Sequence, residues 1–177
     1  MKRFFLLPTL IITLFITSCS SDDNDDGTID GSATLAGSWN LTEFYSEDGS
    51  FSTTILNIPV NFPMSITGKD YDLRIDIGEN PNMVTGEGSY VTVASVDGLP
   101  DAEPVETTIN ASELEGKWSK NGNMLTVSQE SEETVFEIVT LNDTELRLKQ
   151  SFSEEADILE YSATLEADQY FVFTRVQ

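Results

Sequence analysis

Apolar and polar side chains alternate with a period of two along several short segments of this chain. The clearest segment is 71–77, in which Tyr, Leu and Ile occupy every second position and charged residues lie between them. Segments 135–139 and 146–149 repeat the pattern less regularly. A period of two places the apolar set on one face of an extended strand, whereas a helix needs a period of 3.6. These segments therefore predict half-buried β-strands.

Short polar turn sequences separate the segments. Between Trp118 and Leu125, the pair Asn121-Gly122 predicts a hairpin with a type I′ turn, whose two central residues both need positive φ. We count about ten strands and no helix longer than one or two turns. These patterns predict an all-β fold, either an antiparallel barrel or a sandwich. An immunoglobulin-type sandwich is the alternative, although its Cys-Trp-Cys pattern is missing.

The amino-terminal segment has the organisation of an export signal. Lys2 and Arg3 precede an apolar run over residues 4–16, which is short for a membrane span of about 20 residues. The run ends in Ile16-Thr17-Ser18-Cys19 and resembles the lipobox of bacterial lipoproteins, with an aliphatic residue three positions before an obligatory Cys. The resemblance implies that residues 1–18 are a signal peptide and that Cys19 is the lipidated residue. Several acyl chains would then anchor the protein stably to a membrane.

Residues 19–34 are expected to form an acidic, flexible tether. Segment 20–27 contains four Asp and no apolar side chain, so it has nothing to bury. Its placement resembles the acidic export signal of some surface-displayed Gram-negative lipoproteins, and Ser20 replaces the Asp of the common inner-membrane retention signal. We therefore expect an outer-membrane protein facing the extracellular side.

Composition excludes several kinds of chemistry. The chain of 177 residues has 9 Lys and Arg, 31 Asp and Glu, no His and a formal charge of −22. Its single Cys allows no intrachain disulfide, and no His is present as a base or zinc ligand. Because the acidic excess repels phosphate, nucleic acid is not an expected partner.

Carboxylates are the main catalytic groups that remain. With 31 acids, a close pair is expected by chance, so their abundance does not support a hydrolase. Glu43 is the nearest candidate, because it lies between Leu41 and Tyr45 on the expected inward face of Trp39. A β-bulge that turns Glu43 outward explains it equally well. We assign no catalytic residue, no cofactor and no enzymatic activity.

Acidic clusters also suggest hard cations, which prefer oxygen ligands. Segment 22–27 matches the first half of a calcium loop, but the Glu expected six residues after Gly27 is Ala33. The acids at 70–76 and 97–106 are interpreted as a solvated surface. We assign no metal site.

The segment 35–41 (LAGSWNL) resembles the Gly-x-Trp opening of lipocalin-like proteins. The resemblance implies that Gly37 and Trp39 close one end of a barrel and that a basic residue of the last strand, Arg175, packs across the indole as a cation–π contact. Segments 116–127 and 137–146 resemble hairpins of small lipocalin-like lipoproteins. The resemblance covers almost all of residues 35–176. It implies an antiparallel meander β-barrel of about 8–10 strands rather than a sandwich, and we assign residues 35–177 to one lipocalin-like domain.

The regular strands supply a set of candidate interior residues. A barrel of about eight strands can hold one small ligand, and bulky interior residues can instead fill it completely. The candidate interior and ligand-lining residues are Leu41, Tyr71, Leu73, Ile75, Ile77, Phe136, Ile138, Leu146 and Leu148.

Three functions remain open at this point. The first is a non-enzymatic binding module for a small apolar or amphipathic ligand. The second is a packed interaction protein that serves as accessory subunit of a cell-surface complex, with a protein as its partner. The third, which the residues favour least, is a carboxylate-based hydrolase.

Overall fold

The structure, a computed structural model, describes residues 28–98, 103–130, 132–158 and 161–177. Cys19, the expected signal peptide at residues 1–18 and segment 20–27 lie outside the described residues. No described helix is long and apolar enough to cross a membrane. The strands are β1 (Gly37–Ile55), β2 (Ile58–Lys69), β3 (Arg74–Gly78), β4 (Met83–Glu87), β5 (Ser89–Val96), β6 (Val105–Asn110), β7 (Gly116–Asn121), β8 (Met124–Ser128), β9 (Glu133–Leu141), β10 (Glu145–Ile158) and β11 (Tyr161–Arg175), with the 3₁₀ turn η1 (Ala111–Glu113) between β6 and β7.

The strands form a closed, eight-stranded antiparallel barrel. Strands β2 and β3, β5 and β4, and β6 and β7 are the two halves of three bent barrel strands, because each pair meets its neighbours in the same order. Strand β11 returns to pair with β1 and closes the ring. The predicted meander barrel is confirmed, and the sandwich alternative is wrong.

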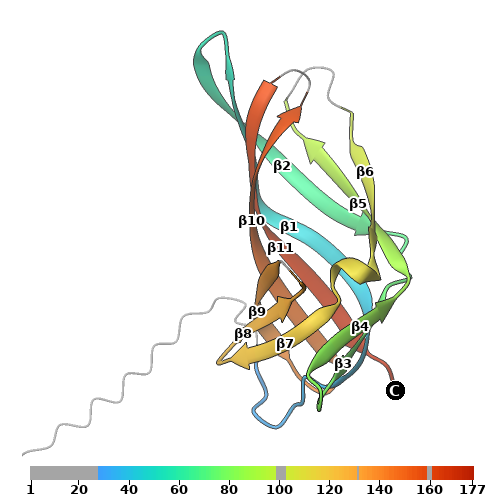
Figure 1. Ribbon diagram of the computed structural model, residues 1–177. Coiled ribbons are helices and arrows are strands. Elements are labelled where there is room, and N and C mark those ends of the chain that lie inside the picture. Colours follow the sequence, from blue (N-terminus) through green and yellow to red (C-terminus); the bar gives the residue numbers. More distant parts are fainter. Residues whose placement is uncertain (1–27, 99–102, 131, 159–160) are drawn as a thin grey trace, which may run out of the picture.

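Two halves of the barrel differ in how completely they close (Figure 1). The base half contains β3, β4, β7, β8 and β9 with residues 37–44 of β1, 145–149 of β10 and 170–175 of β11. The open half contains β2, β5 and β6 with residues 45–55 of β1, 150–158 of β10 and 161–169 of β11. Strand β9 pairs with β10 only as far as Lys149. Within the described chain, β6 and residues 150–158 of β10 therefore each keep one edge without a strand partner.

Gly88 makes the bend between β4 and β5. Its φ is +79°, and a Cβ there would lie 1.7 Å from the carbonyl oxygen of Asp72. This close approach lets the amide of Asp72 donate a 2.9 Å hydrogen bond to the carbonyl of Ser89. Only glycine fits such an approach at positive φ, so the bent strand depends on this residue.

A bulge in β1 explains the acid among its apolar residues. The pairing of β1 with β11 shifts between Leu41 and Glu43, and Glu43 is exposed. The extra residue lets Phe44 return to the inner face, where it is 3 % exposed. Glu43 therefore points away from the core, as the bulge interpretation expected.

The hairpin between β7 and β8 forms where the sequence predicts it, with a different turn. Asn121 pairs with Met124, so the central residues are Gly122 and Asn123, and of these only Gly122 has positive φ (+62°). The predicted type I′ turn centred on Asn121-Gly122 is therefore wrong by one residue. A two-residue turn with positive φ only at its first position suits Gly there.

Candidate functional site

The base of the barrel is closed by Trp39 and Arg175. Trp39 has no exposed surface, and its indole Nε1 donates a 3.0 Å hydrogen bond to the carbonyl of Leu35. The Arg175 guanidinium carbon lies 4.0 Å from the centroid of the indole ring. Its two terminal nitrogens donate to the carbonyls of Ala36 (3.0 Å) and Thr34 (2.5 Å). Through these bonds the last strand, β11, holds residues 34–36, which lead into the first strand, β1.

Gly37 leaves the space that Arg175 occupies. A Cβ at position 37 would lie 2.4 Å from Nη1 of Arg175, and the φ of Gly37 is +143°. Both the space and the backbone conformation exclude a side chain. The three residues that the sequence groups as the barrel-closing signature are thus in direct contact.

The segment before β1 also lies against the base. The carbonyl of Thr28 accepts a hydrogen bond from the amide of Leu141, whose own carbonyl accepts one from the amide of Asp30. Ile29 forms an isolated bridge with Leu141, and Leu35 is 5 % exposed. The residues at 28–34, assigned to the tether from sequence, therefore contact the barrel.

The residues proposed to line a ligand cavity pack together in the base half. Eight of the nine are buried, and Tyr71 is half-buried with its hydroxyl accepting a 3.0 Å hydrogen bond from the amide of Phe44. The void that Ile75, Ile77 and Phe136 help to line has a volume of about 20 Å³. That is room for about one water molecule. In this structure the base half is a core without space for a small-molecule ligand.

The inner face of the open half is apolar and incompletely covered. Cross-strand partners share a face, so residues that pair with buried ones face inward. Phe62 and Leu165 both pair with Phe51, which has no exposed surface. Further apolar inward positions include Val60, Met64, Ile66, Ala94, Val96, Val105, Ile109, Phe152, Ala163 and Ala167.

Exposure rises across this face toward the unpaired edge. Met64 and Ile66 on β2 are buried, whereas Ala94 and Val96 on β5 are half-buried. Val105 on β6, opposite Ala94, is 60 % exposed. Apolar side chains that stay accessible on a concave barrel face are the ordinary lining of a ligand site.

A row of polar side chains separates this face from the packed base. Gln150 and Gln169 are opposite one another on β10 and β11, and Ser46 lies next to Gln169 on β1. All three are half-buried, one step beyond the buried pair Leu148 and Phe171. The inner face thus changes from apolar to uncharged polar at the floor of the open half.

Comparison with protein families matches the lipocalin-like domain to residues 35–148, well over half of the chain. The chain belongs to the lipocalin-like family. No curated protein matches it. The matched segment begins at Leu35, the acceptor of the Trp39 indole, and ends at Leu148, just before the polar row.

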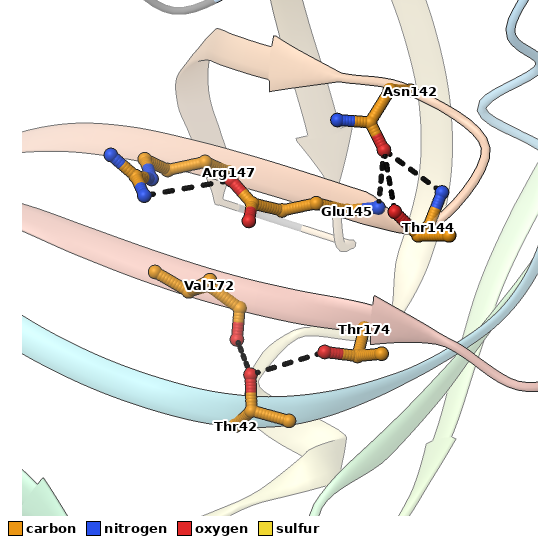
Figure 2. A network of polar contacts seen from close by, with 7 residues as sticks. All are labelled: Thr42, Asn142, Thr144, Glu145, Arg147, Val172 and Thr174. Carbon is orange, nitrogen blue, oxygen red and sulfur yellow. Dashed lines mark hydrogen bonds and ion pairs between the residues drawn. The ribbon is translucent and has the colours of Figure 1, made fainter. Parts of the chain in front are cut away.

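The outer wall of this lipocalin-like barrel is held by polar contacts that serve structure. Figure 2 shows Thr42, the extra residue of the β1 bulge, donating a 3.1 Å hydrogen bond to the carbonyl of Val172. The side-chain oxygen of Asn142 accepts from the amides of Thr144 and Glu145 and so forms the turn between β9 and β10. These contacts satisfy backbone groups that the bulge and the turn leave unpaired.

Several cationic side chains on the outer wall are bound in ion pairs. Hydrogen bonds from Lys149 and Ser151 lower the pKa of the Asp168 carboxyl, and Lys149 Nζ lies 2.8 Å from it. Asp168 in turn raises the pKa of Lys149. On β3, the Ser38 hydroxyl and then Arg74 lower the pKa of Asp76. These groups are charged and paired at neutral pH, which suits a structural role.

An open cleft of about 630 Å³ lies at the joint between β2 and β3. Outward-facing polar residues line much of it, including Asn40, Thr42 and Glu87. Its one cation, Arg74, donates to Ser38 and to Asp76 at 3.0 and 3.2 Å. The cleft mixes both charges and differs in chemistry from the apolar face inside the barrel.

Sequence reasoning missed the open half as a candidate site. One signal was present: residues 49–68, which include most of β2 and the end of β1, contain no charged residue in a chain rich in acids. The outward residues of this stretch are Ser, Thr, Asn and Pro, so the alternation is weaker than in 71–77. Its lack of charge marks the face more clearly than its periodicity does.

Proposed function

We propose that this protein is a non-enzymatic, lipid-anchored binding protein that holds a small apolar or amphipathic molecule against the inner face of its open half. The observation that supports this most is the contrast between the two halves. The base half leaves a void of about 20 Å³, whereas the open half keeps half-buried apolar residues on an incompletely closed face. Lipocalin-like proteins are typically binding proteins, which agrees with this interpretation.

The acids of the described chain give no support to a hydrolase. No Asp or Glu is buried among the described residues. A catalytic acid needs a raised pKa, which burial or a close like charge supplies. Among the described residues, the carboxyl groups whose pKa departs from the ordinary value are Asp30, Asp76 and Asp168, and in all three the pKa is lowered.

The proposed lipid anchor would join the chain on the side of the barrel base. Thr28 lies at the base and follows Cys19 by nine residues, so an extended tether would span at most about 30 Å. Acyl chains on Cys19 would therefore keep the base of the barrel within about 30 Å of the outer membrane. Cys19→Ala is expected to release the protein from membranes or leave it unprocessed. Unchanged fractionation would contradict the lipobox interpretation.

Binding is tested by filling the open half with a larger side chain. Nile red, an uncharged apolar fluorophore, is titrated into the purified full-length chain. Ala94→Phe enlarges an inward position, whereas Val93→Phe enlarges its outward neighbour on the same strand. We expect Ala94→Phe to weaken dye binding about tenfold or more and Val93→Phe to leave it nearly unchanged. Equal effects, or no dye binding by the unmodified protein, would contradict the proposal.

The unpaired edges of β6 and β10 favour a second candidate. An extended segment of a partner protein can add to such an edge through main-chain hydrogen bonds. In that case the protein would act as an accessory subunit of a surface complex. Crosslinking on intact cells tests this, because a covalent adduct that maps to β6 or to residues 150–155 identifies the partner.

A further inference from the structure

We propose that the ligand of the open half carries an uncharged or cationic polar group and that amphiphiles ending in a carboxylate or phosphate are rejected. This inference rests on the proposed function and adds the chemical class of the ligand. It follows from the charges of the inner face and from the polar row formed by Ser46, Gln150 and Gln169.

The inner face of the open half offers no cation. Among its described inward positions, the strand pairings place one charged residue, Glu154, which pairs with Leu165 and is exposed. Every other inward side chain whose position is described is apolar or uncharged. An anionic group on a ligand would meet amides, hydroxyls and one carboxylate.

Nearby cations are held on the outer wall. Lys69 pairs with Val91 on the outward side of β2 and forms a 2.6 Å ion pair with Glu106. Lys149 faces outward beside Tyr170 and Asp168. Neither side chain is directed into the barrel, so neither compensates a buried anion.

Burying an anion without a partner is costly, because the group loses its hydration and gains no opposite charge. The surroundings add to this cost, since the chain carries a formal charge of −22 and such fields act over about 8 Å at physiological salt. A neutral group avoids both the cost of burying a charge and the repulsion by the surrounding acids. A cationic group loses hydration but gains from the surrounding acids.

Gln150 and Gln169 supply what a neutral group needs. Each side-chain amide has two donors and an acceptor with two lone pairs. Both residues are half-buried at the floor of the open half, and neither amide makes a hydrogen bond within the described chain. A hydroxyl, amide or ammonium group of a ligand has suitable partners there, while its alkyl portion lies against Phe62, Val96 and Leu165.

The test compares three amphiphiles with the same twelve-carbon chain: dodecanol, dodecylamine and laurate. Each displaces Nile red from the purified full-length chain at pH 7 and 150 mM salt. We expect half-displacement by dodecanol and dodecylamine at concentrations at least about tenfold below that of laurate. Repeating the titrations at 0.5 M NaCl separates the local preference from the general field, because only the latter is strongly screened.

A variant that introduces a positive charge makes the test specific. Gln169→Lys places a cation in the polar row, and Ser153→Lys adds the same charge at an exposed outward position of β10. We expect Gln169→Lys to strengthen laurate binding about tenfold relative to dodecanol and Ser153→Lys to leave the ratio unchanged. Circular dichroism verifies that both variants keep the β-sheet signal.

The outcomes separate this inference from the proposed function. If laurate binds as well as or better than dodecanol, the headgroup inference is wrong and the binding function stands. If both lysine variants change the laurate ratio equally, the selectivity comes from net charge and the role of the polar row is wrong. If neither Nile red nor dodecanol binds the unmodified chain, the proposed function itself fails.

Discussion

Removal of the Arg175 side chain tests how the barrel is closed. In Arg175→Ala, the indole of Trp39 loses a cation–π contact at 4.0 Å, worth about 1 kcal/mol at a partly exposed site. Two hydrogen bonds, to the carbonyls of Ala36 and Thr34, are lost as well, at about 1 kcal/mol each. The freed carbonyls are near solvent and can be hydrated, so we add no desolvation penalty. The expected loss of unfolding free energy is about 2–3 kcal/mol.

Urea unfolding followed by tryptophan fluorescence measures this loss, because Trp39 is fully buried in the native state. Lys120→Ala is the matched control, since Lys120 is exposed and its removal changes the net charge by the same amount. Arg175→Lys keeps the charge without the planar fork and should fall between Arg175→Ala and the unmodified protein. A loss below about 0.5 kcal/mol in Arg175→Ala, or one equal to that of Lys120→Ala, would refute the reasoning.

Three further predictions concern substitutions of single residues. Leu56 at the β1–β2 turn has a φ of +51° and is 88 % exposed, so Leu56→Asn should raise the unfolding free energy by about 0.5 kcal/mol in the same assay; a decrease would mean that Leu56 has a stabilising contact. Gly88→Ala places a Cβ against the carbonyl of Asp72 and should cost more than about 2 kcal/mol, whereas Gly122→Ala, which shares the positive φ but has open space around it, should cost less. The lowered pKa of Asp168 means that its ionised form stabilises the fold above the ordinary carboxyl pKa of about 3.9. This contribution, about 0.5–1 kcal/mol, should disappear as the pH falls through the folded-state pKa, so unfolding curves of Asp168→Asn and the unmodified protein should differ at pH 7 and approach one another as the carboxyl becomes protonated in acid.

The strands were predictable because their alternation of period two is a short-range pattern. The contact that closes the base joins Trp39 to Arg175 at the other end of the chain, and it was expected only because the Gly-x-Trp segment resembles lipocalin-like proteins. The joint between β2 and β3 was not predictable from this pattern. The alternation in 71–77 continues through Leu73 into β3, although Asp70 has a φ of +53° and the strand begins only at Arg74. Periodicity reports which face a residue occupies and says little about where a strand bends.

The same limit explains why the candidate ligand-lining residues lie in the packed half. Strong alternation requires charged residues on one face and large apolar residues on the other, and such strands fill a barrel interior. The open half contains inward Ala, Thr and Gln beside its larger residues, and outward Ser, Thr and Asn, so both faces are less distinct. A face that must stay accessible to a ligand has smaller and more mixed side chains, which weakens the pattern used to find strands.

The division into two halves reconciles an open edge with a stable fold. Strands β1, β10 and β11 run continuously through both halves, so the packed base fixes their spacing before the open half begins. An open sheet edge normally invites pairing with other chains. Here Glu106 lies on β6, and Glu154 and Glu155 lie on the free portion of β10. These acids oppose edge-to-edge association of two copies, since like charges would meet. The high acidic content thus protects the open half while its inner face stays uncharged along most of its length, and this combination lets one face remain accessible to an apolar molecule.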